Sequence, residues 1–460
     1  MSTKNNSSNP IFTPIQYGAA TAKNRVVLAP LTRVRADKDL RPTDLHVEYY
    51  SQRADAGLLI TEATVISPQS IASHHIPACF NEQQALAWKR VTDAVHAKGA
   101  IISLQAWHQG RAAHRSYTNH PLAKEANAEV GESSSEIALS EYYQEPDCDT
   151  LERSPHQKPK IMTIDDIERF KQQQLDAANL ALNVAGFDLY ELHGAHGYLF
   201  DQFLNSNSNT RTDQYGGSFE NRFRLLGEVL DLLTAKYPNR IAVRISPYNK
   251  GTTGYHDMND EDPEALYKYV YERLSEYNLA YVLNTEPRWD FQYQGNPEND
   301  TSASWPLTSS KYCEIFKNNN KTTKLIGCGG FTPQSALGVM DMPEDKRPYD
   351  AIGFGRWFIA NSDLVFRLRH NLPLNRYYRP TFYVTPPFDE AIKFTTGYTD
   401  YPTFSQLAKS EFGDGIEVEQ IAQDDEKIAH LVKKHQDDLY ALIPTDIIGN
   451  SKSSSSRQTN

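Results

Sequence analysis

The feature that most constrains the fold of this chain is a series of short apolar runs that alternate with amphipathic stretches. Continuous rather than alternating apolarity is typical of parallel strands that are buried on both faces. Eight runs occur, at residues 26–30, 58–64, 100–107, 187–193, 241–247, 280–286, 323–329 and 351–355, and helical patterns are clearest at residues 82–98, 163–185, 218–236, 263–277 and 332–340. Eight strand–helix units predict one (β/α)8 barrel of the TIM type, in the α/β class.

The alternative for such a pattern is a doubly wound open sheet. That fold is expected to carry a glycine-rich dinucleotide turn, G-x-G-x-x-G, after its first strand. The residues at this point are Pro30, Leu31, Thr32 and Arg33. Because this turn holds no glycine, the sequence favours the barrel.

Three segments interrupt the eight units or lie outside them. We expect residues 1–10 to be a disordered tail, because this polar stretch has too little apolar surface to offset the entropy of ordering. Residues 11–409 are predicted to form the barrel domain, with residues 111–162 as a loop that overhangs its C-terminal face after the third strand. Residues 410–460 are predicted to be a C-terminal extension with a helix at 424–441 and a disordered Ser-rich end.

Composition argues against several classes of function. The chain holds 47 Lys and Arg against 58 Asp and Glu, a net charge of −11, and we expect no nucleic-acid partner because phosphate neutralisation drives such binding. Cys79, Cys148, Cys313 and Cys328 are too widely spaced to indicate a zinc site or an iron–sulfur cluster. Without an apolar run of membrane-spanning length or a signal-peptide pattern, we expect a cytoplasmic protein with no membrane partner.

Candidate functional residues follow the predicted strands. Reactive groups in (β/α)8 barrels lie at the carboxyl ends of the strands, around one mouth. A single polar residue at a strand end is more often structural than functional, but here most strands end in polar residues or glycines, which favours a shared site. The candidates are Thr32, Gln105, Trp107, His193, His196, Tyr198, Arg244, Gly329, Gly330, Gly355 and Arg356.

Glycine turns follow the last two strands. Gly329 and Gly330 follow the seventh strand, and Gly355 and Arg356 follow the eighth. The loops at these positions commonly bind phosphate in this fold. Glycine lets backbone N–H groups approach the phosphate oxygens, and an arginine can contact two of them. We interpret the turns as a phosphate site; the alternative is two tight turns and an arginine in a salt bridge.

Three residues suit the polar edge of a flavin. Arg244 lies in an otherwise apolar strand, where its charge is costly unless an anionic group meets it, and the pyrimidine side of a reduced flavin is such a group. The Gln105 amide can both donate to and accept from a flavin edge, and Thr32 can donate its hydroxyl. The alternative for Arg244 is a buried pair with a carboxylate.

Residues 193–198 read His-Gly-Ala-His-Gly-Tyr. Two histidines three residues apart are compatible with zinc, but no third ligand is indicated and the H-E-x-x-H pattern is absent, so we expect no metal. Buried core histidines are a second alternative. We favour an oxyanion clamp, in which His193 and His196 donate to a substrate oxygen that gains charge and Tyr198 supplies a proton.

These motifs resemble those of the old yellow enzyme family, the FMN-dependent ene-reductases. The resemblance covers residues 11–409, and its most specific part is the stretch from Glu191 to Arg222, which contains the His-Gly-Ala-His-Gly-Tyr motif. Further matching stretches are residues 24–33, 48–54, 105–111, 243–247, 353–361 and 372–375.

The resemblance implies tightly held, non-covalent FMN, NADPH as reductant, and a ping-pong reduction of the C=C bond in α,β-unsaturated carbonyl or nitro compounds. It implies that His193 and His196 bind the activating group and that Tyr198 donates the proton. Thr32 resembles the branch found in yeasts, plants and many bacteria. By position, the FMN contacts are Pro30, Leu31, Thr32, Ala63, Gln105, Arg244, Gly329, Gly330, Gly355 and Arg356, and the substrate wall is Trp107, Phe382 and Tyr383.

Two alternative functions stay open. The protein could be a dedicated biosynthetic enone reductase or isomerase for one natural product, or a flavin-binding, stress-associated protein without strong turnover. Residues 111–162 and the extension match the family pattern poorly, which leaves the substrate open. The choice between NADPH and NADH, and between monomer and homodimer, is open as well.

Overall fold

The computed structural model describes residues 6–71, 75–114, 120–128, 131–140, 142–144, 153–247, 258–286, 307–319, 322–383, 394–435 and 438–440. Eight strands form one closed barrel, in which every neighbouring pair is parallel. This confirms the predicted (β/α)8 fold. In barrel order the strands are β3 (Val26–Leu28), β4 (Leu58–Val65), β5 (Ile101–Trp107), β10 (Leu189–Gly194), β11 (Ile241–Ile245), β12 (Tyr281–Thr285), β13 (Lys324–Cys328) and β14 (Ala351–Phe354).

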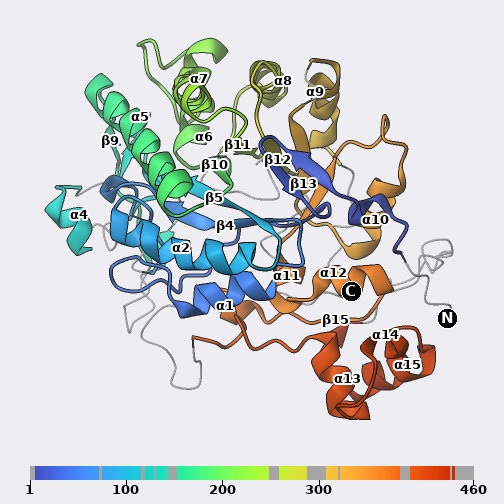
Figure 1. The fold of residues 1–460 in the computed structure, drawn as a ribbon. Coiled ribbons are helices and arrows are strands. Elements are labelled where there is room, and N and C mark those ends of the chain that lie inside the picture. Colours follow the sequence, from blue (N-terminus) through green and yellow to red (C-terminus); the bar gives the residue numbers. More distant parts are fainter. Residues whose placement is uncertain are drawn as a thin grey trace, which may run out of the picture.

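A ring of helices surrounds the barrel (Figure 1). One helix follows each strand around the ring: α1 (Asp44–Gln52), α2 (Glu82–His96), α5 (Ile164–Asn179), α7 (Phe219–Lys236), α8 (Pro263–Leu274), α9 (Cys313–Asn319), α10 (Pro333–Asp341) and α12 (Leu364–His370). The helix predicted at residues 163–185 is regular only to Asn179 and then widens into the π-helical turn Leu180–Val184. A reciprocal cap starts α5, since the Asp166 N–H donates to Thr163 Oγ1 and the Thr163 N–H donates to Asp166 Oδ2.

The hydrophobic core has two layers. One lies between strands and helices, and the other fills the barrel interior with side chains such as Leu58, Ile101 and Leu189. The hairpin β1 (Ile15–Tyr17) and β2 (Ala20–Ala22) adds Tyr17 to this inner layer, with its ring centroid 5.8 Å from that of Tyr281. The hairpin therefore packs at the amino ends of the strands, and the carboxyl ends remain available for a site.

The predicted overhang contains short elements of its own. They are η3 (Gly110–Ala112), α4 (Pro121–Glu125), the parallel pair β6 (Glu132–Ser133) and β9 (Lys160–Ile161), and the antiparallel pair β7 (Tyr142–Gln144) and β8 (Arg153–Pro155). Both η3 and β6 contact α6 (Leu199–Leu204), the helix that follows the His-Gly-Ala-His-Gly-Tyr loop. This part of the overhang therefore lies beside the candidate loop.

The C-terminal extension begins earlier than predicted and is only partly helical. Helices α13 (Phe404–Phe412), α14 (Val418–Ile421) and α15 (Asp425–Lys434) share a separate cluster of buried side chains, and Figure 1 shows them gathered outside the helical ring. The helix predicted to reach residue 441 is wrong beyond His435, because Leu439–Tyr440 forms strand β16 and pairs with β15 (Leu374–Asn375). That strand pairing ties the extension to the barrel.

The folded part also begins earlier than the predicted boundary at residue 10. The Asn6 N–H donates to the Arg369 carbonyl at 2.9 Å, and Asn9 Nδ2 donates to Asp341 Oδ1 at 2.6 Å. These residues are anchored by hydrogen bonds from the backbone or the side chain, which a count of apolar residues does not detect. Residues 1–5 and 441–460 lie outside the described residues.

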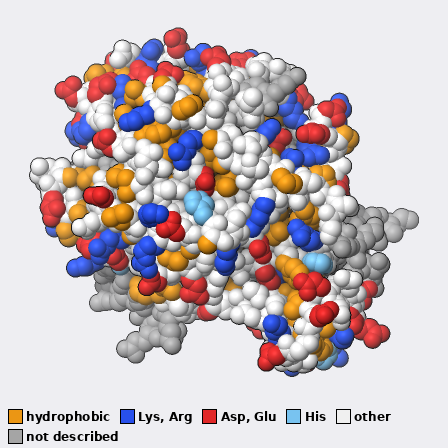
Figure 2. All heavy atoms as spheres, viewed as in Figure 1, with side chains coloured by type: hydrophobic (Ala, Val, Ile, Leu, Met, Phe, Trp, Pro, Cys, Tyr) orange, Lys and Arg blue, Asp and Glu red, His pale blue; other side chains and the backbone are white. Residues whose placement is uncertain are grey.

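The surface carries both signs of charge. Figure 2 shows Lys and Arg side chains interspersed with Asp and Glu over the visible face, with small hydrophobic areas between them. Among the described helices, none is both long and apolar enough to cross a bilayer.

Candidate active site

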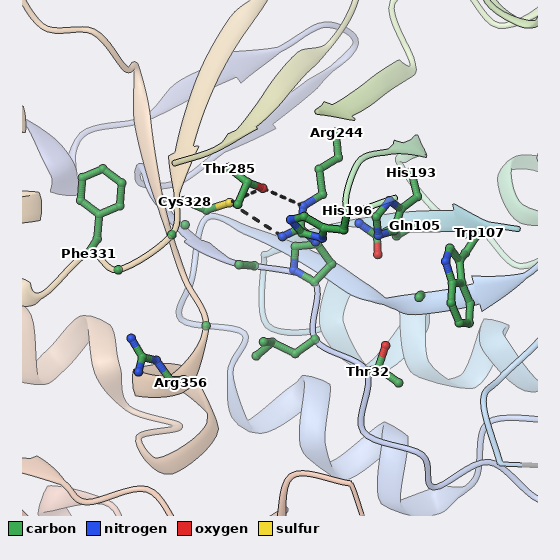
Figure 3. Close-up of a pocket in the computed structure, with 18 of the residues that line it drawn as sticks. Thr32, Gln105, Trp107, His193, His196, Arg244, Thr285, Cys328, Phe331 and Arg356 are labelled. Carbon is green, nitrogen blue, oxygen red and sulfur yellow. Dashed lines mark hydrogen bonds between the residues drawn. The ribbon is translucent and has the colours of Figure 1, made fainter. Parts of the chain in front are cut away.

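A cavity of about 470 Å³ opens at the carboxyl ends of the strands, and Figure 3 shows the side chains that surround it. Its volume is in the range typical of small-molecule and cofactor sites. It brings together nearly all of the sequence-predicted residues: Pro30, Leu31, Thr32, Ala63, Gln105, Trp107, His193, His196, Tyr198, Arg244, Gly329, Gly330, Gly355, Arg356 and Tyr383. Segments far apart in the sequence thus build one site.

Phe382 is the predicted residue that does not line the cavity. Its side chain is buried, and its ring centroid lies 5.9 Å from the Arg33 guanidinium carbon and 5.8 Å from the Tyr377 ring. The 3-10 turn η9 (Arg379–Thr381) precedes it. Tyr383, 56% exposed, lines the cavity instead.

Gln105 and Arg244 lie on the barrel floor of the cavity. Gln105 Nε2 donates to the carboxylate of Glu191 at 2.6 Å. Arg244 Nε donates to Thr285 Oγ1 at 3.2 Å, and its Nη2 lies 4.0 Å from Cys328 Sγ (Figure 3). Both of these hydrogen-bond partners of Arg244 are neutral groups, so the guanidinium can meet an anionic ligand in the cavity as well as attract the Glu191 carboxyl below it.

A β-bulge sets one wall of the cavity. The register between β4 and β5 shifts between Ile60 and Ala63, which places Ala63 opposite Gln105 on the cavity side. Strict alternation from the inward Leu58 and Ile60 would have turned Ala63 outward. A small side chain here leaves room above the barrel floor.

The predicted phosphate turns have the backbone that this role requires. Gly329 and Gly330 have φ of 98° and 67°, in the left-handed region that glycine adopts most readily. A Cβ at Gly329 would lie 2.4 Å from the Glu286 carbonyl oxygen, and one at Gly355 would lie 3.2 Å from Leu31. Arg356 Nη1 donates to the Tyr377 hydroxyl at 3.2 Å.

Gly329→Ala is expected to weaken both the fold and the site. The positive φ alone costs about 1–3 kcal/mol, and the backbone contact with Glu286 adds to this because neither atom can move aside. The matched control is Gly338→Ala in α10, where an added Cβ meets nothing within 4 Å, and where alanine stabilises by about 0.4–1 kcal/mol. Denaturant unfolding of both variants measures this, and equal stabilities would contradict the account of the turn.

The His-Gly-Ala-His-Gly-Tyr loop joins β10 to α6 at the cavity. The ring of His193 lies 5.5 Å from that of His196 and 4.9 Å from that of Tyr198. Trp107 packs edge-on against Tyr198, with ring centroids 4.9 Å apart. Two imidazoles and one phenol therefore face the same volume, which suits binding of one oxygen and proton delivery nearby.

Backbone strain in this loop is held by buried hydrogen bonds. His196 has φ of 58°, which costs a non-glycine residue about 1–3 kcal/mol. The His196 N–H donates to Ser246 Oγ at 2.8 Å, and the Gly197 N–H donates to Asp201 Oδ2 at 2.8 Å. Ser246 directly follows β11, so a neighbouring strand end fixes the position of the second histidine.

Gln202 fastens the loop to the overhang, a role that sequence reasoning missed. Its Nε2 donates to the Gly197 carbonyl at 2.6 Å and to the Gln109 carbonyl at 3.0 Å. Its Oε1 accepts from the Arg111 N–H at 2.9 Å and from the Ser133 hydroxyl at 2.8 Å. One fully buried amide thereby joins three loops at the mouth of the barrel.

Two arginines that follow Thr32 position the far wall. Arg33 Nε donates to the Phe382 carbonyl at 3.1 Å, and Arg33 Nη2 donates to the Gly397 carbonyl at 2.7 Å. Arg35 Nη2 donates to the Thr381 carbonyl at 3.0 Å. Both side chains are almost fully buried. They hold the segment that carries Tyr383 against the barrel.

Other cavity residues were absent from the sequence-based set. Several are neighbours of predicted residues at strand ends, so a wider window at each strand end would have included them. Arg379 could have been found as a charged residue within the aromatic-rich stretch Tyr377–Tyr383. The additional residues are Ala29, Thr285, Cys328, Phe331, Gly353, Trp357 and Arg379.

Comparison with known proteins gives the class to which this fold and site belong. Residues 10–375 match the NADH:flavin oxidoreductase / NADH oxidase family. The 12-oxophytodienoate reductase 7 of Oryza sativa subsp. japonica is 38% identical over 406 residues, which are 86% of this chain and 95% of that protein. The probable inactive dehydrogenase easA of Claviceps fusiformis is 35% identical over 418 residues, 90% of this chain and 99% of that protein. The structure of morphinone reductase superposes with a TM-score of 0.72 at 34% identity, covering 88% of this chain and 98% of that one.

The barrel and the matched family define a flavin-dependent oxidoreductase with FMN as its cofactor. Within that class, the chain belongs to the old yellow enzyme family. This confirms the family inferred from the sequence motifs.

The cavity residues fit FMN by their chemistry. Gly329 and Gly330 present backbone in a conformation open to close approach, and Arg356 adds a cation at the same turns. At the other end, Gln105 offers an amide and Arg244 a buried positive charge. A phosphate at the glycine turns and a flavin edge at the barrel floor would match both donor sets.

Proposed function

We propose that this protein is an ene-reductase that oxidises NADPH and reduces the C=C bond of α,β-unsaturated carbonyl or nitro compounds by a ping-pong cycle. The observation that carries the proposal is the placement of His193, His196 and Tyr198 in one loop beside the cavity, with Arg244 and Gln105 on its floor. Two relatives with this fold are named as reductases, one of oxophytodienoate and one of morphinone. Their names support a ketone-activated alkene as the substrate class.

FMN, held in the cavity, would supply the hydride-transfer chemistry between the nicotinamide and the alkene. The protein holds the cofactor in place. Arg244, Gln105 and the Thr32 hydroxyl are proposed to bind the flavin ring, and Gly329, Gly330, Gly355 and Arg356 to bind the phosphate. The remaining ring contacts are proposed to be Pro30, Leu31 and Ala63.

The two histidines are proposed to bind the activating oxygen of the substrate. Hydride addition to the β-carbon places negative charge on that oxygen, so ring N–H donors aimed at it stabilise the transition state more than the ground state. The 5.5 Å separation of the His193 and His196 rings lets both reach one oxygen. Trp107 and Tyr383 would form the walls around the alkene.

Tyr198 is proposed to deliver the proton to the α-carbon. Its ring is held edge-on between Trp107 and His193, which fixes the direction of the hydroxyl. A positioned phenol of this kind contributes typically about 10²- to 10⁴-fold to a rate.

A visible spectrum of the purified protein tests the proposal first. We expect a yellow protein with one FMN per chain that is released on denaturation, and consumption of NADPH that accelerates when cyclohexenone is added. Parallel assays with NADH measure the nicotinamide preference. A colourless protein that does not take up added FMN would contradict the proposed function.

The overhang favours one alternative, a dedicated reductase for a single natural product. Gln202 fixes Ser133 and Arg111 of the overhang beside the catalytic loop, so the overhang can restrict what enters. Assays with a panel of cyclic enones, acyclic enals and nitroalkenes distinguish a general reductase from a dedicated one. A general reductase would reduce several of these substrate classes, and a dedicated one would reduce few. A yellow protein that oxidises NADPH but reduces no alkene would instead match the relative named as probably inactive.

A further inference from the structure

Glu191 is a buried carboxyl beneath the cavity that the proposed mechanism does not use. It lies on β10, two residues before His193, and its side chain is fully buried. The strand register places it opposite Gln105 of β5, and Gln105 faces the cavity. Glu191 therefore lies on the inner side of the barrel, one layer below the flavin ring of the proposed function.

The contact with Gln105 fixes the direction of the Gln105 amide. Gln105 Nε2 donates one hydrogen to Glu191 Oε1 at 2.6 Å. The other N–H and the carbonyl oxygen of the amide then remain to donate to and accept from a ligand above. Glu191 thus sets which atoms of Gln105 are available to the flavin edge.

Among the groups packed around Glu191, Arg244 carries the main opposing charge. Tyr281 from β12, Tyr17 from β1 and Cys328 from β13 face the same region, and burial raises the pKa of each above its usual value, so all three are neutral near pH 7. His193 follows on the same strand. Burial raises the pKa of the Glu191 carboxyl to about 7, and the Arg244 charge and the Gln105 hydrogen bond act in the opposite direction.

We propose that Glu191 is a positioning residue that takes up one proton from solvent when the cavity above Arg244 gains a negative charge. The inference rests on the proposed function, since flavin reduction supplies that charge. While the cavity holds no added charge, Arg244 stabilises the Glu191 carboxylate. A new anion in the cavity beside Arg244 repels the carboxylate and so offsets the Arg244 attraction, which favours the protonated form.

The proton and electron balance gives a measurable signature. A hydride from NADPH carries two electrons and one proton to the cofactor, so its transfer consumes no proton from solvent, and the cofactor gains one negative charge. Uptake by Glu191 adds one solvent proton and keeps the barrel floor at constant charge. Reduction should then be linked to two protons in total above pH 7, where Glu191 starts ionised, and to one proton well below pH 7, where it is already protonated.

The decisive experiment is proton uptake by the wild-type holoenzyme on anaerobic reduction with one equivalent of NADPH, followed with a pH-indicator dye in weakly buffered solution. We expect close to one proton per flavin at pH 8 and fewer at pH 6. Uptake of no proton at pH 8 would overturn the proposal while leaving the reductase function intact. A failure of NADPH to reduce the flavin would instead count against the proposed function, so the two failures are distinguishable.

The pH dependence of the flavin midpoint potential in Glu191→Gln provides a second test of the proton uptake. Glutamine keeps an acceptor for Gln105 but cannot ionise. The equilibrium constant for flavin reduction should change about tenfold per pH unit for each linked proton, which shifts the midpoint potential by about 30 mV for a two-electron couple. The change of midpoint potential per pH unit above pH 7 should therefore be twice as large in the wild type as in Glu191→Gln. The matched control, Glu132→Gln, removes a buried carboxylate of β6 that pairs with Arg169 outside the cavity, and it should keep the wild-type slope. Identical slopes in all three proteins would contradict the inference.

The pH dependence of stability tests the buried charge separately. A carboxyl whose folded pKa is raised from 4.5 to about 7 stabilises the fold fully below pH 4.5, and this contribution is lost as the pH rises through 7. Glu191→Gln should therefore gain stability relative to wild type between pH 5 and pH 8 in denaturant unfolding of the oxidised holoenzyme. A stability difference that does not change with pH would show that Glu191 does not carry a titrating charge in the fold.

Discussion

Replacing Tyr198 with Phe is expected to slow alkene reduction by about 10²- to 10⁴-fold, the usual contribution of a positioned general acid, while the reduction of the flavin by NADPH stays nearly unchanged. The hydroxyl is the group that supplies the α-proton in the proposed mechanism, and the reaction with NADPH needs no such proton. The phenylalanine ring keeps the edge-on packing against Trp107 and His193. Rapid-mixing measurement of the two half-reactions separates the effects.

The matched control for this variant is Tyr378→Phe. Tyr378 is 60% exposed and does not line the cavity, so the loss of its hydroxyl should change neither half-reaction. If Tyr198→Phe slowed both half-reactions equally, the residue would act through the structure of the site and not as a proton donor. Unchanged alkene reduction would assign the proton to another group.

The second large effect is expected from the histidine pair. Removing one hydrogen bond to an oxygen that carries charge costs about 1.5–3 kcal/mol, or roughly 10- to 10²-fold in kcat/KM for the alkene. His193→Ala should therefore slow the alkene half-reaction by this amount. Loss of both donors should bring the total to about 10²- to 10⁴-fold, because each histidine acts on the same oxygen. The rate of flavin reduction should change far less.

At position 196, the test requires a residue that can adopt the left-handed backbone conformation of His196. Because His196 has φ of 58°, alanine would add strain, whereas asparagine adopts this conformation more readily and keeps an N–H donor. His196→Asn should thus retain much of the alkene activity, and the His193→Ala/His196→Asn pair should resemble His193→Ala. His430→Ala, on the exposed face of α15, is the control. Full activity in a variant without either histidine would contradict the oxyanion clamp.

The barrel could be predicted because its signal is local. Each strand is a short continuous apolar run, and the eight observed strands all lie at the predicted runs, with ends that differ by a few residues. The secondary structure near the C-terminal end was harder to predict. Residues 424–441 have helical composition, but Leu439–Tyr440 pairs with β15, a strand more than sixty residues away in the chain, and local periodicity holds no information about such a pairing.

For the site too, features set by local sequence could be predicted and features set by distant contacts could not. Strand-end residues such as His193 and Arg244 could be identified because the fold itself brings strand ends together. The residues that hold these side chains in place could not be identified from the sequence. Gln202 is one of two polar residues in a short, otherwise apolar helix. Its role becomes visible only when the fold brings Gly197, Gln109 and Ser133 around it.

Phe382 shows the same dependence on distant contacts, here in a residue that was predicted for the site but does not line the cavity. Its neighbour Tyr383 lines the cavity, and the sequence gives no reason to separate the two aromatic residues. The difference comes from Arg33, which binds the Phe382 carbonyl and packs against its ring. A contact between residues 349 positions apart in the chain thus helps to determine which of the two rings faces the site.

The most direct test of the central claim is an anaerobic titration of the purified protein, followed by its visible flavin spectrum. NADPH should bleach the flavin band at one equivalent per chain, and subsequent cyclohexenone should restore it with formation of one equivalent of the saturated ketone. Restoration that becomes slower in Tyr198→Phe and in His193→Ala, but remains fast in His196→Asn, would support the roles assigned to the loop. A flavin that NADPH reduces but that no activated alkene reoxidises would contradict the claim that this protein is an ene-reductase.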